Sequence, residues 1–272
     1  MKTTALFLVA TIAIWTPSGA LGNEVEVDLE LVLAVDVSSS VQEDEQFLQR
    51  QGYVTAFQSP RVIAAIRSGP LGRIAVAYVE WGDPRNQRLI VPWTIVDDRL
   101  SAMSLAYRLG QEPITRSFGT SIAGAIRYSA ALFEGNGFQS ERRVIDLSGN
   151  GPNNLGAPVG PARDAVVAQG VTINGLPIMI HLTCCSGLSS IEGLDYYFED
   201  CVTGGPGAFV IPIRRREEIA ETIQRKLLQE IAGPREGLYP IAFVKRPRID
   251  CAGIEKNPAR ILPLVPRESR EH

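Results

Sequence analysis

LVLAVDVSSS, residues 31–40, is the stretch that decides the fold of this chain. Its first five residues are apolar without interruption, which is typical of a β-strand buried on both faces in a parallel sheet. The strand runs into the carboxylate of Asp36 and then into the hydroxyls of Ser38 and Ser40. Ligands of open α/β sheets bind just beyond the carboxyl ends of the strands. Hard oxygen donors favour a cation such as Mg²⁺ over Zn²⁺, so the stretch predicts a metal site at the end of a buried strand.

Two later segments carry groups that could join Asp36. Gly119-Thr120-Ser121 precedes an amphipathic stretch, which predicts that Thr120 lies at the start of a helix. Residues 145–151 read IDLSGNG, which predicts a strand followed by a turn that carries Asn150. The amide oxygen of Asn150 can accept a hydrogen bond from a metal-bound water, but it adds no negative charge.

Predicted strands and helices alternate along the chain. We predict strands near residues 29–36, 73–81, 88–93, 142–148, 171–180 and 208–213, with helices between most of them. The turn at 82–84 is too short for a parallel crossover, so the two strands that flank it must be antiparallel. The chain is therefore expected to be α/β: a doubly wound, mostly parallel six-stranded sheet with one antiparallel edge strand and helices on both faces.

Four residues resemble the metal-ion-dependent adhesion site of the Rossmann-like von Willebrand factor type A domains, namely Asp36, Ser38, Ser40 and Thr120. The resemblance covers about residues 28–232 and implies the strand order 3-2-1-4-5-6. It also implies a non-enzymatic protein-binding module, in which an acidic residue of a partner protein completes the shell of Mg²⁺ (or Mn²⁺ or Ca²⁺). The chain further resembles an exported bacterial branch of this superfamily whose role is unassigned.

The fourth position of the motif departs from the family pattern. Asn150 stands where the family usually has an Asp, so the site has one carboxylate where two are usual. Because metal affinity follows the charge of the ligands, we expect weaker binding than in relatives with Asp at this position. A degenerate and empty site is the alternative. Ser38–Ser40 and Thr120 also have a simpler interpretation as helix N-caps, a role that Ser and Thr favour.

The N-terminal 22 residues resemble a secretory signal peptide. Lys2 supplies the positive charge, residues 5–15 form the apolar centre, and small residues allow cleavage after Ala20 or Gly22. The apolar run is too short to span a bilayer comfortably, and no later segment of the mature chain is apolar for long enough. We therefore expect a periplasmic or secreted protein.

Composition favours one globular domain and argues against a nucleic-acid partner. The chain has 272 residues, of which 45% are hydrophobic and 21% charged, and this is ordinary for a folded domain. The net charge is −3, so no basic field exists to attract nucleic acid. We assign residues 28–232 to the domain and residues 233–272, rich in Pro and charge, to a C-terminal extension.

Four cysteines are compatible with an oxidising compartment, namely Cys184, Cys185, Cys201 and Cys251. Their spacing is not that of a zinc site, and three connectivities are possible. A bond between the neighbours 184 and 185 would be strained, so we expect one of them to join Cys201 and the other Cys251. A pair of free, buried cysteines is the alternative.

A hydrolase is the competing function. Ser38 and Ser148 lie at predicted strand ends, but a Ser-His-Asp mechanism needs a histidine, and the chain has only His181 and His272. The sequence also lacks a Gly-x-Ser-x-Gly elbow and a phosphate-binding Gly-x-x-x-x-Gly-Lys-Ser/Thr loop. We expect a non-enzymatic protein, with a periplasmic small-molecule binder that uses the same crevice as a further alternative.

Overall fold

The computed structural model describes residues 24–180, 193–233 and 248–257. A five-stranded sheet forms its centre, in the order β4-β3-β2-β6-β7. Four strands are parallel, and β4 pairs antiparallel with β3 at the edge, as predicted. The strands are β2 (Glu30–Asp36), β3 (Ile74–Trp81), β4 (Gln87–Val96), β6 (Arg143–Gly149) and β7 (Val171–Pro177).

β2 lies in the middle of the sheet because its side chains are apolar toward both faces. All of its residues are buried. Leu31, Leu33 and Val35 pack into the hydrophobic cluster on one face, whereas Val32 and Ala34 pack into the cluster on the other. The alternation of side chains along a strand thus gives the sheet two apolar faces, and each needs a layer of helices.

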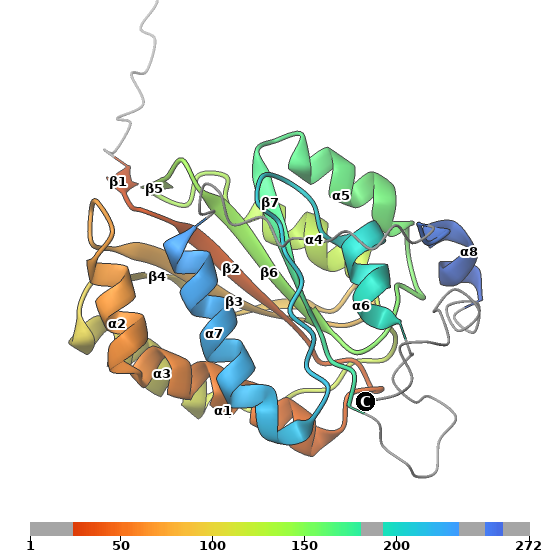
Figure 1. Ribbon diagram of the computed structural model, residues 1–272, viewed down its shortest axis with the longest axis horizontal. Coiled ribbons are helices and arrows are strands. Elements are labelled where there is room, and N and C mark those ends of the chain that lie inside the picture. Colours follow the sequence, from red (N-terminus) through yellow and green to blue (C-terminus); the bar gives the residue numbers. More distant parts are fainter. Residues whose placement is uncertain (1–23, 181–192, 234–247, 258–272) are drawn as a thin grey trace, which may run out of the picture.

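Figure 1 shows the two helical layers on opposite sides of the sheet. One layer contains α1 (Glu43–Gln58), α2 (Pro60–Arg67), α3 (Arg99–Gln111) and α7 (Ile219–Ala232), the last preceded by a 3₁₀ turn at Arg216–Glu218. The other contains α4 (Ile122–Ala131), α5 (Val159–Val167) and α6 (Leu194–Tyr197), the last continued by a π-helical turn at Phe198–Val202. The doubly wound α/β class predicted from the sequence is confirmed.

Two helices begin where local signals predict. The Ser59 side chain accepts a hydrogen bond from the backbone of Arg61, with Pro60 in the first turn of α2. Asp98 caps α3 by accepting a 2.8 Å hydrogen bond from Ser101 N. These caps mark the first residues of α2 and α3.

The sheet has five strands rather than the predicted six. Residues 208–213 run beside β7 as isolated bridges, Gly175 with Val210 and Ile178 with Ile213, rather than as a continuous strand. Backbone hydrogen bonds still join the two segments, for example from Gly175 N to Phe209 O at 3.0 Å and from Ile213 N to Pro177 O at 2.9 Å. Pro177 lies between the donors Gly175 and Met179 and has no amide hydrogen, so the ladder lacks the bond that this position would make. A small parallel sheet, β1 (Val25–Glu26) with β5 (Phe138–Gln139), was not predicted, because two-residue strands carry no readable pattern.

The disulfide differs from the predicted pairing. Cys201 is bonded to Cys251, and this bond attaches the short helix α8 (Cys251–Lys256) to the end of the α6 segment. Cys184 and Cys185 lie outside the described residues, as do the proposed leader, His181 and His272. We expected two bonds, in which one of the neighbours Cys184 and Cys185 joins Cys201 and the other joins Cys251. This expectation is wrong, because the fold brings Cys201 and Cys251 to a Cα separation of 5.7 Å and they bond to each other.

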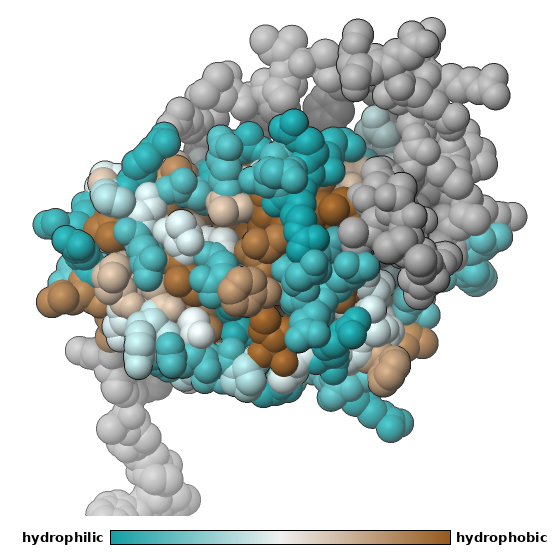
Figure 2. Space-filling view, turned by 90° about the horizontal axis from the view of Figure 1, so that it is seen from below, coloured by the Kyte–Doolittle hydropathy of each residue, from teal (hydrophilic) through white to brown (hydrophobic). Residues whose placement is uncertain are grey.

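The surface mixes hydrophilic and hydrophobic residues. Figure 2 shows the face seen from below as a mosaic in which brown residues are separated by teal ones. Single exposed apolar residues are ordinary on folded proteins. Within the described ranges, none of the helices has the length and apolar character that crossing a bilayer requires.

Candidate metal centre

Asp36 is the last residue of β2 and is fully buried. Its Oδ1 accepts a 2.7 Å hydrogen bond from Ser38 N. Its Oδ2 is buried and has no hydrogen-bond partner. Burial raises the pKa of Asp36 to about 6, although hydrogen bonds from the side chain and backbone of Ser38 and from the backbone of Asn150 act in the opposite direction. A buried carboxylate oxygen without a partner is costly, so this oxygen is available to a cation.

Two serine hydroxyls and an amide lie together beyond the strand ends. Ser38 Oγ and Ser40 Oγ are 2.9 Å apart, and Ser40 Oγ donates a 2.8 Å hydrogen bond to Asn150 Oδ1. Asn150 directly follows β6, which is parallel to β2 and in register with it. The site of a Cβ on Gly149 would lie 3.4 Å from Asp36 Oδ2. The carboxyl ends of two neighbouring strands therefore bring these four predicted site residues to one edge of the sheet.

Thr120 reaches the same edge from the loop between α3 and α4. Ser117 in this loop forms an isolated bridge with Ser38 and donates a 2.9 Å hydrogen bond from its backbone to Val37 O. Thr120 is buried. Its N donates to Asn154 Oδ1 at 2.9 Å, and its O accepts from Asn154 N at 2.9 Å. The loops that carry Ser38, Thr120 and Asn150 thus lie side by side.

Residues outside the proposed ligand set provide the helix caps. The N-cap of α1 is Gln42, two residues beyond Ser40. The N-cap of α4 is Ser121, whose Oγ accepts a hydrogen bond from Gly124 N at 3.3 Å. The capping interpretation of Ser38–Ser40 and of Thr120 therefore does not hold in this fold.

Gly119 is required by the close packing of the Thr120 loop. Its φ of +76° lies in the left-handed region that residues with a Cβ rarely adopt. A Cβ at this position would lie 2.1 Å from Leu155 Cδ1. The glycine therefore lets the loop pass close to residues 150–158, a segment between β6 and α5 that is called the 150–158 loop below.

The donor set is suited to a hard divalent cation. It consists of one carboxylate, three hydroxyls and one amide oxygen, and oxygen ligands are those that Mg²⁺ and Ca²⁺ prefer. Asp36, Ser38, Ser40, Thr120 and Asn150 would hold the ion. Elsewhere in the described part of the chain, no group of three or more His, Cys, Asp or Glu side chains is placed to hold a metal.

Some residues at this edge were not identified from the sequence. Arg116 donates from Nη2 to Ser39 O at 3.0 Å and so ties the two loops together. Ser117 and Asn154 hold the Thr120 loop from either side. Residues 151–154 read GPNN, a composition typical of a turn, but no local pattern indicates that Asn154 would bind a residue 34 positions earlier.

The serines considered as nucleophiles have other partners. Ser148 is fully buried and its Oγ donates to Gln49 Oε1 at 3.3 Å. Ser38 Oγ is engaged with Ser40 Oγ. The Ser148 hydroxyl is thus bonded to a neutral amide oxygen, whereas the Ser38 side chain also hydrogen-bonds to the Asp36 carboxylate.

Comparison with solved structures identifies the fold. Proximal thread matrix protein 1 (PTMP1) from the mussel byssus matches with a TM-score of 0.56 and 14% identity, over 78% of this chain and 50% of that chain. A second PTMP1 structure, described as having a zinc-occupied MIDAS motif, matches with a TM-score of 0.53 and 14% identity over the same shares. The pilus adhesin SpaC from Lactobacillus rhamnosus GG matches with a TM-score of 0.54 and 12% identity, over 77% of this chain and 31% of that chain.

These matches show a von Willebrand factor type A-like fold. The matched region spans 50% of the length of PTMP1 and 31% of the length of SpaC. No curated protein sequence matches the chain significantly. The family model described as "Protein of unknown function (DUF1194)" matches residues 26–235. The chain therefore belongs to the DUF1194 family and has a von Willebrand factor type A-like domain.

Proposed function

We propose that this chain is an exported, non-enzymatic binding module that captures a carboxylate of a partner protein through a divalent cation. The cation would be Mg²⁺, with Mn²⁺ or Ca²⁺ as substitutes, held by Asp36, Ser38, Ser40, Thr120 and Asn150. We expect the protein to act in the periplasm or outside the cell.

The unpartnered oxygen of Asp36 carries this proposal. Asp36 Oδ2 is buried next to the strand ends, and the hydroxyls of Ser38 and Ser40 lie beside it with Asn150. The solved PTMP1 structure with a zinc-occupied MIDAS motif supports a divalent cation in a domain of the same fold. A bound cation would offset the desolvation of the Asp36 carboxylate.

A low count of anionic ligands would leave the ion attractive to an external carboxylate. Asp36 is the single carboxylate of the set, because Asn150 contributes a neutral amide. The bound ion would therefore keep most of its positive charge and supply electrostatic attraction for an acidic side chain. The same low charge predicts weak affinity for the ion itself.

The rim of the site offers apolar contacts for such a partner. Phe118 is 83% exposed and Leu155 is 45% exposed, and both adjoin the Gly119-Thr120 segment. Large exposed apolar residues beside a charged centre fit the anatomy of a protein interface, where aromatic side chains supply much of the binding energy. We expect a partner that presents an acidic residue next to an apolar one.

Metal binding is tested first, by calorimetric titration of the mature protein with Mg²⁺ and with Mn²⁺. The variants are Asp36→Ala and the matched control Glu43→Ala, which removes an exposed carboxylate at the start of α1. We expect binding by the wild type and by Glu43→Ala but not by Asp36→Ala. Identical heats for the wild type and Asp36→Ala would refute the metal centre.

Partner capture is tested next, with the same proteins as immobilised bait for an envelope extract. A partner of the proposed kind is retained with Mg²⁺ by the wild type and Glu43→Ala, and it is lost with chelator or with Asp36→Ala. The captured protein is then mutated at its exposed acidic residues. A partner whose binding survives both chelator and Asp36→Ala would contradict capture through the metal.

A further inference from the structure

Glu255 connects the C-terminal helix α8 to the 150–158 loop. Glu255 Oε1 accepts hydrogen bonds from Val159 N at 3.2 Å and from Tyr197 OH at 3.3 Å. Its Oε2 accepts one from Asn153 Nδ2 at 3.3 Å. Burial raises the pKa of Glu255, while these three hydrogen bonds lower it. One partly buried carboxylate thus organises donors from the 150–158 loop, α5 and α6.

Asn153 links Glu255 to the elements that hold Thr120. Its side chain is bonded to Glu255, and its Oδ1 also accepts a 3.2 Å hydrogen bond from Ala123 N in the first turn of α4. The next residue, Asn154, holds Thr120 through two hydrogen bonds of 2.9 Å. A continuous series of hydrogen bonds and one peptide link therefore runs from α8 to a proposed metal ligand.

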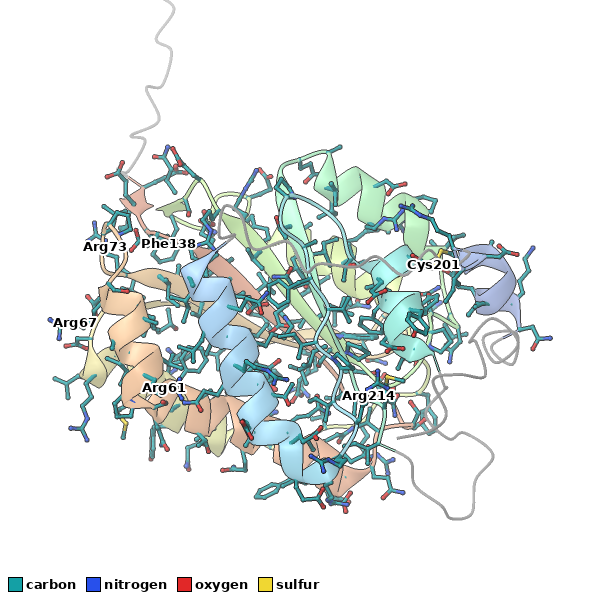
Figure 3. The ribbon with its side chains drawn as sticks, in the orientation of Figure 1. Arg61, Arg67, Arg73, Phe138, Cys201 and Arg214 are labelled. Atoms are coloured by element: carbon teal, nitrogen blue, oxygen red, sulfur yellow. A yellow bond between two sulfur atoms is a disulfide. The ribbon has the colours of Figure 1, made fainter. Side chains whose placement is uncertain are left out.

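The disulfide and two further contacts fix α8 in place. Figure 3 shows Cys201 where the α6 segment approaches α8, and its sulfur is bonded to that of Cys251. Ile249 N donates a 2.8 Å hydrogen bond to Asp200 Oδ2, and Ile254 is buried in the hydrophobic cluster of this face. The disulfide joins residues 50 positions apart, and such a bond restricts the unfolded chain and opposes detachment of α8.

We propose that Glu255 is a positioning residue for the metal centre, which it supports by ordering the 150–158 loop against Thr120. The Cys201–Cys251 bond supports this role by attaching α8, which carries Glu255, to the α6 segment. The expected effect of Glu255 on metal affinity rests on the proposed function, because it requires the proposed metal centre. Cys251 and Glu255 both lie beyond residues 26–235, the part of the chain that the family model matches. The C-terminal extension would then be a working part of the binding site.

Variants of Glu255 separate this role from general stabilisation. Glu255→Ala removes all three acceptor contacts. Glu255→Gln keeps the shape of the side chain and one acceptor oxygen, but it turns an amide nitrogen toward either Asn153 or Val159. Lys256→Ala is the matched control, because it truncates the exposed neighbour on the same helix. A variant with both Cys201→Ser and Cys251→Ser removes the covalent attachment of α8.

Two measurements are made on each full-length mature protein well below its unfolding temperature. Titration with Mn²⁺ gives the metal affinity, and hydrogen exchange gives the protection of the Thr120 and Asn154 amides relative to core amides of β2. We expect Glu255→Ala to weaken Mn²⁺ binding about tenfold, as is usual for residues that support metal ligands. We also expect it to speed exchange at Thr120 and Asn154 but not in β2. Glu255→Gln and the double serine variant should show smaller changes in the same direction, and Lys256→Ala none.

The outcomes distinguish this inference from the proposed function. Wild-type affinity and wild-type exchange in Glu255→Ala would overturn the positioning role even if the protein binds Mn²⁺. A wild type that binds no Mn²⁺ would overturn the proposed function, and the exchange of the Thr120 amide would still decide whether Glu255 orders this loop. If Glu255→Ala does not fold, Glu255→Gln decides between the two results. A uniform loss of protection throughout the protein would show that Glu255 only stabilises the fold.

Discussion

Two buried aspartates on neighbouring strands have opposite surroundings. Asp146 on β6 lies 2.6 Å from Lys226 Nζ, and Lys226 also lies 2.5 Å from Glu230, all three being almost completely buried. Asp36 at the end of β2 is equally buried, but no cationic side chain in the described ranges pairs with it, and its Oδ2 has no partner. The two carboxylates are separated by a few residues along adjacent strands.

The difference indicates which carboxylate is structural and which is available for binding. A buried charge persists only if an opposite charge or several hydrogen bonds compensate it. The protein itself supplies the cation at Asp146. At Asp36 the surrounding groups are hydroxyls and an amide, whose oxygens would suit the cation from solvent that we propose.

The largest effect should follow from removing the cation of the internal cluster. Lys226→Met leaves Asp146 and Glu230 buried without an opposite charge, so we expect a loss of about 3–5 kcal/mol in the free energy of unfolding. Denaturant titration measures it. The triple variant Asp146→Asn, Lys226→Met, Glu230→Gln removes all three charges together and should lose much less. A loss below about 1 kcal/mol in Lys226→Met would show that the cluster is not a compensated charge network.

The next effect concerns Asp36, whose removal should leave the metal-free protein close to wild-type stability. Asp36→Asn keeps an oxygen for Ser38 N and removes an uncompensated buried charge. With Mg²⁺ at a hundred times its dissociation constant, the wild type should gain about 2.7 kcal/mol and the variant nothing. Thermal unfolding with and without Mg²⁺ measures both. Equal stabilisation of the two proteins would place any bound metal elsewhere.

A smaller effect is expected when Asn150 is replaced by the carboxylate that the family usually has. Asn150→Asp adds a second negative ligand, so we expect metal affinity to rise about tenfold, which corresponds to about 1.4 kcal/mol. Asn154→Asp is the control, because it adds the same charge to the 150–158 loop and keeps an acceptor oxygen for Thr120 N. Calorimetry measures the affinities. A similar rise in both variants would indicate a general electrostatic effect.

The smallest effect is a dependence of stability on pH that comes from the internal cluster. Burial, and then the charge of Asp146, raises the pKa of Glu230 to about 7, although Lys226 opposes this. The unfolded chain ionises Glu230 near its usual pKa of 4.5, so between about pH 4.5 and 7 the folded state holds more protons. Stability should therefore fall as pH rises through this window, by at most about 1.4 kcal/mol per pH unit.

Glu230→Gln removes this titration and should flatten the fall relative to the wild type. Denaturant titrations at half-unit steps between pH 5 and 7.5 measure the slopes. Carboxylates whose pKa is lowered, such as Asp44 and Asp98, act in the opposite direction at lower pH and are unchanged in the variant. Parallel slopes for the wild type and Glu230→Gln would show that the cluster keeps its charges across this range.

The architecture could be predicted because its signals are local. The apolar run before Asp36 indicates a strand with two buried faces, and the short turn at 82–84 requires an antiparallel partner. Capping at Ser59 and Asp98 marks where two helices begin. The sixth strand was predicted wrongly, since apolar character indicates a strand but does not show that Pro177 would remove a donor from its pairing.

The candidate site residues were predicted from their place at strand ends and from resemblance to a known family. Parallel neighbouring strands bring their carboxyl ends together, which places Asn150 within hydrogen-bonding distance of Ser40 although 110 positions separate them. The contact between Glu255 and Asn153, 102 positions apart, could not be predicted from the arrangement of strand ends. It depends on where the disulfide attaches α8, and the choice among the possible pairings of four cysteines is not contained in their spacing.

The sequence by itself determined the α/β class, the central buried strand, the antiparallel edge and the oxygen-rich ends of two strands, because these follow from the periodicity and composition of short segments. The tertiary structure alone decided that Cys201 pairs with Cys251, that Lys226 neutralises Asp146, and that Asp36 keeps one oxygen without a partner. Each of these depends on side chains from distant segments that packing brings within a few ångströms. Their free energy depends on how deeply these groups are buried, and the sequence of a short segment does not show that burial.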